Sequence, residues 1–106
     1  MTDRFESVSF ADLFARIDAV RAHRESFLSE VADGTVGLEG VFEVGTVDPV
    51  IAGMKVLPAI EGLPGLAKVQ TRRAFADVGI EEGDHIEAVG SDAITALPAA
   101  LERRAL

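Results

Sequence analysis

The sequence has 106 residues, a formal net charge of -8 and a hydrophobic content of 48%, which is typical of one small globular domain rather than a disordered chain. It contains no cysteine, which excludes disulfides and thiolate metal sites. No apolar run approaches the roughly 20 residues of a membrane span and the start lacks the order of a secretory signal, so we expect a soluble cytoplasmic protein.

The first predicted element is a long amphipathic helix, Phe10–Ala32. Apolar residues recur in it at helical spacing, and the arginines lie mostly on the other face. Ser9 with Asp12 three residues later resembles a helix cap, and Gly34 is a typical stop. The apolar stripe thins over residues 20–27. We therefore expect the N-terminal half of this helix to pack on a partner or to extend away from the body.

Proline and glycine divide the rest of the chain into short predicted helices. Thr35 is expected to cap the first of them, and Asp48 followed by Pro49 reads as a cap and a first helical position. Ser91-Asp92 is expected to cap the last helix, which Pro98 should kink or divide. The predicted segments are residues 35–44, 49–52, 57–63, 68–78 and the stretch that follows Ser91. The predicted fold class is all-α, with a long helix in residues 1–34 and a compact helical domain in residues 35–106.

Charge is distributed unevenly along the chain. Residues 1–48 hold ten acids against four arginines, a net -6, and residues 77–106 hold seven acids against two arginines, a net -5. Residues 49–76 hold four basic residues against Glu61 alone, a net +3. The total argues against nonspecific binding of nucleic acid, whose affinity depends on basic side chains that neutralise phosphates. The positive centre nevertheless suggests a local site for an anion.

That centre contains a predicted helix-hairpin-helix at residues 57–78. Gly65, after Leu63-Pro64, can take the positive φ of a tight turn, and the first amides of the next helix then point outward, where the helix dipole also favours an anion. Lys68 and Arg72 are four residues apart and can flank one phosphate. The alternative is a simple turn between helices with basic residues in solvent. Both interpretations stay open on these residues alone.

A longer pattern surrounds the hairpin and consists of VIAGMKVLPAIEGLPGLAKVQTRRAF, then VGI, then VGSDAITAL. It resembles the actinobacterial integration host factor family, whose pattern is close to V-I-G-K-M-K-V, L-P-x-V-G-K-V-x-A, L-G-I and R-R-x-R-G-L-G. The similarity covers residues 50–97. The fixed spacing from Met54-Lys55-Val56 to Leu63-Pro64 makes it more specific than the hairpin alone.

The resemblance implies a long N-terminal helix followed by a helix-two-turns-helix domain. It also implies a nucleoid protein and recombination cofactor that binds duplex DNA through backbone and minor-groove contacts, without a metal or other cofactor. The expected nucleic-acid-binding residues are Lys55, Pro64, Gly65, Leu66, Ala67, Lys68, Arg72 and Arg73.

The sequence departs from the family pattern at positions that bear on this function. The second hairpin glycine is Ala67, which would be strained if the position needs a positive φ. The basic N-terminal arm is replaced by an acidic-to-neutral helix. Asp84, His85 and Glu87 stand in three basic positions of the arginine-rich segment, and we expect them to lie beside the DNA surface and weaken binding.

Two other binding functions compete with this one. A divergent relative could have exchanged DNA for a protein partner, such as a recombinase, with an acidic surface that repels or imitates DNA. Separately, residues 79–101 resemble the end of a PDZ domain, which binds peptide termini but requires about five strands. The DNA-binding and protein-partner hypotheses differ in what they require of the basic residues. DNA binding needs one exposed patch, clear of carboxylates, formed by Lys55, Lys68, Arg72 and Arg73.

An enzymatic function is not expected. Glu82, Asp84, His85 and Glu87 have side chains that can bind a divalent cation, but a solvated acidic loop is the commoner reason for such a group. His23 lies on a charged helix face and is expected to be simply exposed. No combination of nucleophile, base and orienting group can be assembled from the sequence, so we predict neither a catalytic nor a metal site.

Overall fold

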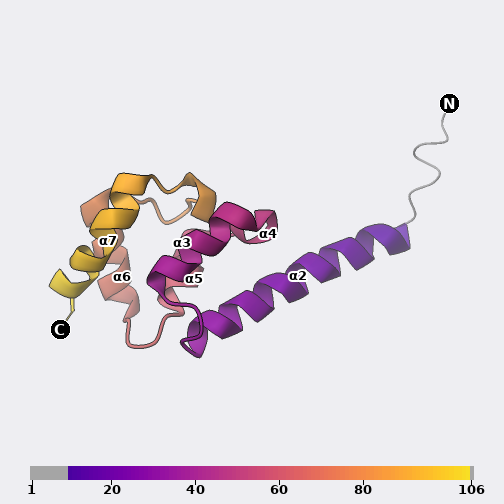
Figure 1. Cartoon of the computed structure of the whole chain (residues 1–106), viewed down its shortest axis with the longest axis horizontal. Coiled ribbons are helices and arrows are strands. Elements are labelled where there is room, and N and C mark those ends of the chain that lie inside the picture. Colours follow the sequence, from indigo (N-terminus) through magenta and orange to yellow (C-terminus); the bar gives the residue numbers. More distant parts are fainter. Residues whose placement is uncertain (1–9, 106) are drawn as a thin grey trace.

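The computed structural model describes residues 10–105, and this part of the chain is helical apart from its connections (Figure 1). Its α-helices are α2 (Phe10–Ala32), α3 (Leu38–Val47), α4 (Pro49–Ala52), α5 (Val56–Glu61), α6 (Lys68–Val78) and α7 (Ser91–Arg103), with a 3-10 turn, η1, at Ile86–Ala88. The all-α prediction is confirmed. The PDZ-like alternative is wrong, because residues 10–105 form no strand and contain only an isolated bridge.

Helix α2 has the predicted limits and extends away from a compact body formed by the later helices (Figure 1). Only Phe27 and Val31 near its C-terminal end are buried, whereas the apolar side chains near its N-terminal end lie in solvent. The described chain consequently measures 59 × 26 × 22 Å. The proposed cap at Ser9 falls outside the described residues. No helix within residues 10–105 has the length and apolarity needed to cross a membrane.

The second predicted helix is displaced toward the C-terminus. It was expected at residues 35–44 with Thr35 as its cap, but α3 begins after Gly37 and continues to Val47. Thr35 instead donates its backbone N–H to the Asp33 carboxylate at 2.9 Å, within the turn that follows α2. The side chain of Asp33 therefore stabilises the turn, and the next helix begins only after it.

Asp48 caps α4 as predicted. Its Oδ1 accepts hydrogen bonds from the backbone N–H groups of Val50 and Ile51 at 3.0 and 3.4 Å. The other carboxylate oxygen lies 2.6 Å from Nε2 of His23. His23 is exposed as expected, but it also has a partner in Asp48 that the sequence did not predict. This pair, together with the bond from Arg24 Nε to the Val50 carbonyl, fixes α2 against α4.

The pair gives a prediction for acid unfolding. The hydrogen bond from His23 lowers the pKa of the Asp48 carboxyl in the folded protein. A carboxyl with a lowered folded pKa contributes stability above its unfolded pKa of about 4 and loses it as the pH falls through the folded value. We expect the free energy of unfolding to fall below about pH 4, with a shallower fall in His23→Ala. Urea unfolding measured from neutral to acidic pH checks this, and identical pH dependence in both proteins would contradict it.

One hydrophobic core joins all the helices of the body. The largest side chains that are fully buried are Phe75, Ile51, Ile60, Leu97, Val31, Val41, Val56 and Thr71. The one polar member of this set, Thr71, donates its hydroxyl to the Ala67 carbonyl at 3.0 Å, so no hydrogen-bonding group is left without a partner there. The hairpin helix α6 is therefore held rigidly by the core on its inner face.

Helix α7 differs from the prediction in its cap and in its continuity. Gly90 rather than Ser91 is its N-cap residue, and Pro98 does not divide the helix, which continues to Arg103. Leu97, Ala100 and Leu101 on its inner face are buried. Packing of this face onto the body outweighs the loss of one intrahelical hydrogen bond at Pro98.

A close contact between α3 and η1 gives a second prediction. A methyl group at Gly45 would lie 2.6 Å from Cγ2 of Ile86, a buried and β-branched side chain. We expect Gly45→Ala to lower the free energy of unfolding by about 1–2 kcal/mol, because overpacking exceeds the gain in helix propensity. Chemical denaturation measures this. Gly40→Ala in the same helix, 3.1 Å from Val36, is the control and should have a smaller effect. Equal effects would exclude the contact with Ile86 as the cause.

Candidate nucleic-acid interface

Helices α5 and α6 are joined by a tight connection at residues 62–67. Gly65 in this connection has a φ of +83°, and a side chain there would meet open space, so the backbone conformation alone requires glycine. Ala67 is the N-cap of α6 with a φ of -89°. The strain expected for alanine at this position is therefore absent.

The first turn of α6 is fixed by Gln70. Its Oε1 accepts the backbone N–H of Ala67 at 3.2 Å, and its Nε2 donates to the Leu101 carbonyl at 2.9 Å. The glutamine thus ties the start of α6 to α7. The backbone N–H groups of the first turn have no partner within the helix and carry the positive end of its dipole. The result is a rigid, outward-facing set of donors.

The basic residues near the hairpin do not form one patch clear of carboxylates. Arg72 approaches Glu61 at 3.4 Å and Glu82 at 3.9 Å, so acidic side chains already surround its charge. Lys68 is exposed, and neither it nor Arg73 has an ion pair with the residues that the structure describes. Lys68 and Arg73 are therefore the basic groups of α6 that remain available to a ligand.

A hollow of about 300 Å³ lies at the start of α6. It is lined by Gly65, Ala67, Val69, Gln70, Arg73, Arg104 and Ala105. It combines the αL turn at Gly65, the first turn of α6 and two guanidinium groups, Arg73 from α6 and Arg104 from the end of α7. Its geometry suits an anion, because oriented N–H groups and arginine side chains are the usual ligands of phosphate.

Arg104 was not among the residues chosen from the sequence. It lies 31 residues beyond Arg73, and only the folding of α7 onto α6 brings the two to one hollow. Its guanidinium donates two hydrogen bonds to Asp77, at 2.8 and 2.7 Å. This hydrogen bonding lowers the pKa of the Asp77 carboxyl and raises that of Arg104. Asp77 thus orients Arg104 and also neutralises part of its charge.

The segment that carries the acidic substitutions is joined to the start of α5. The backbone N–H of Val56 donates to the Asp84 carbonyl at 2.9 Å, and that of Ile86 donates to the Met54 carbonyl at 2.8 Å. The two bonds form an antiparallel bridge in which Lys55 lies opposite His85. Lys55 is thus next to the acidic segment and separated along the chain from the hollow at α6.

Within this segment, Asp84 has a structural role. Its Oδ2 accepts the backbone N–H of Glu81 at 3.0 Å and closes the turn that precedes the bridge. His85 and Glu87 are exposed by contrast. No group of three acidic or histidine residues that could hold a metal ion occurs within residues 10–105.

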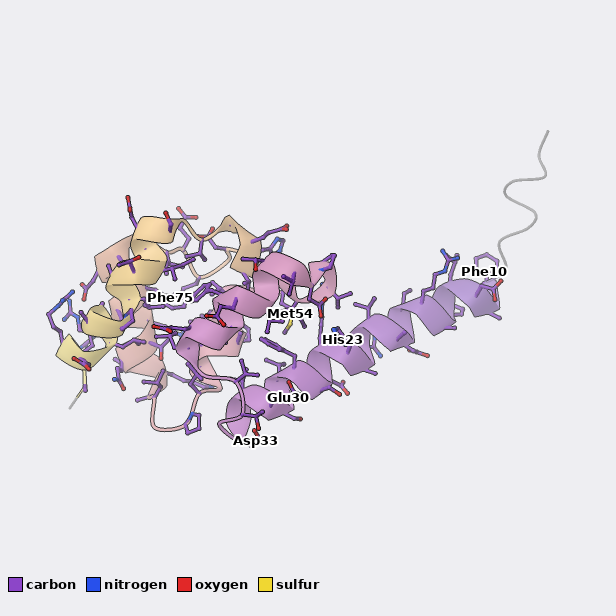
Figure 2. All side chains as sticks on the ribbon, in the orientation of Figure 1. Phe10, His23, Glu30, Asp33, Met54 and Phe75 are labelled. Carbon is purple, nitrogen blue, oxygen red and sulfur yellow. The ribbon has the colours of Figure 1, made fainter. Side chains whose placement is uncertain are left out.

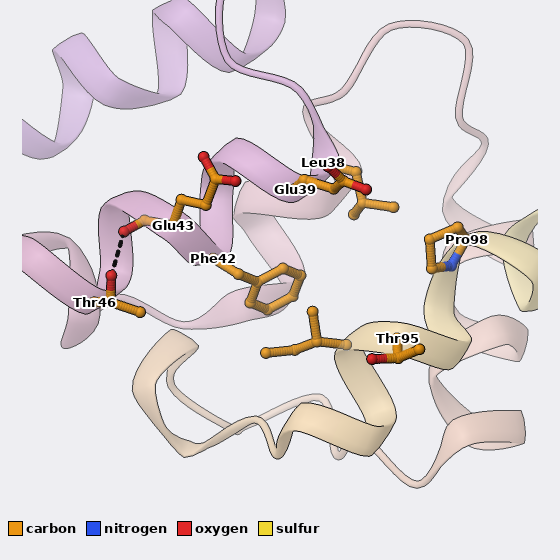
Figure 3. A pocket seen from close by; sticks show the side chains of 8 residues that line it. Leu38, Glu39, Phe42, Glu43, Thr46, Thr95 and Pro98 are labelled. Atoms are coloured by element: carbon orange, nitrogen blue, oxygen red, sulfur yellow. Dashed lines mark hydrogen bonds between the residues drawn. The ribbon is translucent and has the colours of Figure 1, made fainter.

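A second hollow lies between α3 and α7 (Figure 3). Phe42, Ile94 and Pro98 provide its apolar surface, and Glu39 and Glu43 carry carboxylates at its α3 side. Its volume is about 440 Å³. It contains no basic side chain, so its chemistry differs from that of the hollow at α6.

No family model matches the sequence. A curated protein named integration host factor, from Streptomyces coelicolor strain A3(2), is 30% identical to it over 79 residues, which are 74% of each chain. The chain belongs to the actinobacterial integration host factor family. A solved structure described as sIHF bound to an 8bp palindromic DNA matches with a TM-score of 0.74 and 28% identity. The match covers 82% of this integration host factor homologue and 98% of the solved chain.

The family resemblance read from residues 50–97 is thereby confirmed. The similarity extends beyond that motif, since the structural match covers most of the described helices as well. In this integration host factor homologue, the Met54–Val56 segment of the motif forms the bridge to the acidic segment. The motif therefore includes residues that hold the body together as well as the hairpin.

Proposed function

We propose that this protein is a nucleoid-associated protein of the cytoplasm that binds the backbone of duplex DNA through the start of α6, and that it is not an enzyme. The relative's name and the DNA in the matching solved structure support this function. The observation that carries it is the hollow where Arg73 and Arg104 adjoin the open first turn of α6.

Each part of the proposed site has a distinct task. The connection Pro64–Ala67, which includes Leu66, presents the first amides of α6 to one phosphate, and Arg73 and Arg104 neutralise its charge. Lys68 contacts an adjacent phosphate, and Val69, exposed beside the hollow, packs against the sugar. Such contacts position the duplex and carry no base sequence information. Lys55 contributes outside the hollow, beside His85.

The proposed binding is weak because the basic groups are few and the chain is acidic. Arg72 is paired with Glu61 and Glu82, and Asp77 neutralises part of the charge of Arg104. At most four basic groups therefore contribute, namely Lys68, Arg73 and Arg104 at α6 and Lys55 beside His85. We expect the log-log dependence of the association constant on salt to have a slope no steeper than about -4. Fluorescence polarisation with duplexes of unrelated sequence, from low to physiological salt, measures it. A slope near zero, or strong preference for one sequence, would contradict phosphate-directed binding.

The hollow between α3 and α7 favours a second function, binding of a protein partner such as a recombinase. An apolar surface with Glu39 and Glu43 beside it suits a segment that carries apolar and basic side chains. Thr95→Arg should fill this hollow and abolish association with such a partner while DNA binding persists. Loss of DNA binding in Thr95→Arg, with the fold intact by circular dichroism, would assign the hollow to the DNA interface instead.

A further inference from the structure

The N-terminal half of α2 carries a row of exposed apolar side chains. Phe10, Leu13, Phe14 and Ile17 are 78, 41, 62 and 53% exposed. Their spacing places them on the face of α2 that Phe27 and Val31 bury further along the helix. Figure 2 shows Phe10 at the end of α2 that extends from the body. The apolar face that packs on the core at the C-terminal end of α2 thus continues for about two helical turns beyond the core.

Where α2 meets the body, basic side chains join the apolar ones on this face. A hollow of about 390 Å³ there is lined by Ile17, Val20, Arg21, Arg24, Glu25, Leu28 and Met54. Arg24 is held in place by its hydrogen bond to the Val50 carbonyl. The face therefore has two phenylalanines at its free end and two arginines at its root.

We propose that this face pairs antiparallel with the same face of a second copy of the chain. A two-fold axis at Ile17 places Phe10 opposite Arg24 and Leu13 opposite Arg21 of the second copy. The free end of each helix then enters the hollow at the root of the other. Phenyl rings meet guanidinium groups, an attractive arrangement. A parallel pair would instead bring Arg21 next to Arg21 and Arg24 next to Arg24, which repel one another.

The available area agrees with a specific but weak dimer. If each large apolar residue has a surface of about 200 Å², the exposed parts of these four side chains provide about 450 Å² of apolar surface per chain. The total area buried by the two faces, with the aliphatic stems of Arg21 and Arg24 included, approaches the roughly 1,200 Å² at which specific interfaces begin. We expect a dissociation constant on the order of 10 µM.

The net charge of the chain does not oppose this arrangement. Residues 10–24 contain three arginines and two aspartates, a net +1 in a chain of -8. With the axis at Ile17, the bodies lie about 30 Å apart along the paired helices. This exceeds the Debye length of about 8 Å at physiological salt. The dimer should therefore persist at high salt, where the proposed DNA binding is lost.

Sedimentation of the full chain without DNA, from about 1 to about 100 µM, tests the proposal. We expect a monomer–dimer equilibrium for the wild type and a monomer for Phe14→Glu with Ile17→Glu. The control is Val47→Glu, because Val47 is 81% exposed but lies outside α2 and should leave the dimer intact. Circular dichroism confirms that each variant is folded. A monomeric wild type throughout, or assemblies larger than a dimer, would overturn the proposal.

Disulfide cross-linking tests the orientation of the two helices. Single-cysteine variants can be used directly, because the chain contains no cysteine of its own. Ile17→Cys should form a disulfide dimer under mild oxidation, because the residue lies on the two-fold axis. Ala15→Cys, exposed on the far face of the same helix, should not. Phe10→Cys distinguishes the orientations, since only parallel helices bring two copies of residue 10 together. Efficient linkage through residue 10 or 15 in preference to 17 would exclude the antiparallel pair.

Discussion

Lys68→Glu with Arg73→Glu should reduce affinity for duplex DNA by more than about tenfold at low salt and make the salt dependence shallower by about two units. Both side chains lie near the start of α6, and neither forms an ion pair within residues 10–105, so the full charge of each is available to a phosphate. The loss should be the same for every duplex sequence, because phosphate contacts carry no base information.

The matched control for this variant reverses two arginines of α2. Arg16→Glu with Arg21→Glu changes the net charge by the same amount at exposed positions outside α6. Polarisation titrations of both variants separate a site effect from a charge effect. Equal losses would show that net charge rather than the hairpin determines affinity. A single Arg72→Ala variant should have a small effect, since Arg72 lies between Glu61 and Glu82.

The second large effect is expected from the acidic segment. His85→Arg with Glu87→Arg restores two basic positions of the family pattern and raises the net charge by three units, one for neutral histidine and two for glutamate. If this segment lies at the DNA surface, two new phosphate contacts should tighten binding at low salt by about tenfold or more and steepen the salt slope by about two units.

Asp84 should be left in place in that experiment. Its carboxylate accepts the Glu81 amide, so Asp84→Arg would remove a turn contact together with a charge. Ser29→Arg with Glu30→Arg on α2 gives the same change in net charge at exposed positions and serves as the control. Equal gains in both variants would place the segment away from the DNA, and the family's arginine-rich site could not then be transferred to residues 85–87.

The parts of the fold that follow from local chemistry could be predicted from the sequence. Asp48-Pro49 predicted the start of α4, and the spacing of apolar residues predicted the full extent of α2. The predicted segment 68–78 coincides with α6, which Gly79 caps with a positive φ. The displaced start of α3 shows the limit of this approach. Both Thr35 and Asp33 can cap a helix or a turn, and only the tertiary arrangement decides between these uses.

Contacts between residues distant in sequence could not be predicted in this way. Arg104 joins Arg73 only because α7 packs on α6, and Arg72 meets Glu61 across the hairpin. His23 reaches Asp48 across 25 residues. Each of these contacts changes which charges are available to a ligand. The sequence therefore located the basic centre, but it could show neither the acidic partners of Arg72 nor the position of Arg104 beside Arg73.

The bridge between residues 54–56 and 84–86 has a consequence for how this protein can evolve. Its two hydrogen bonds join main-chain atoms only, and the side chains of Lys55 and His85 in the bridge and of Glu87 just after it are exposed. Side chains in such a position can change sign without disturbing the core. If this segment meets DNA as proposed, single-nucleotide substitutions there would change affinity step by step while the fold stays the same.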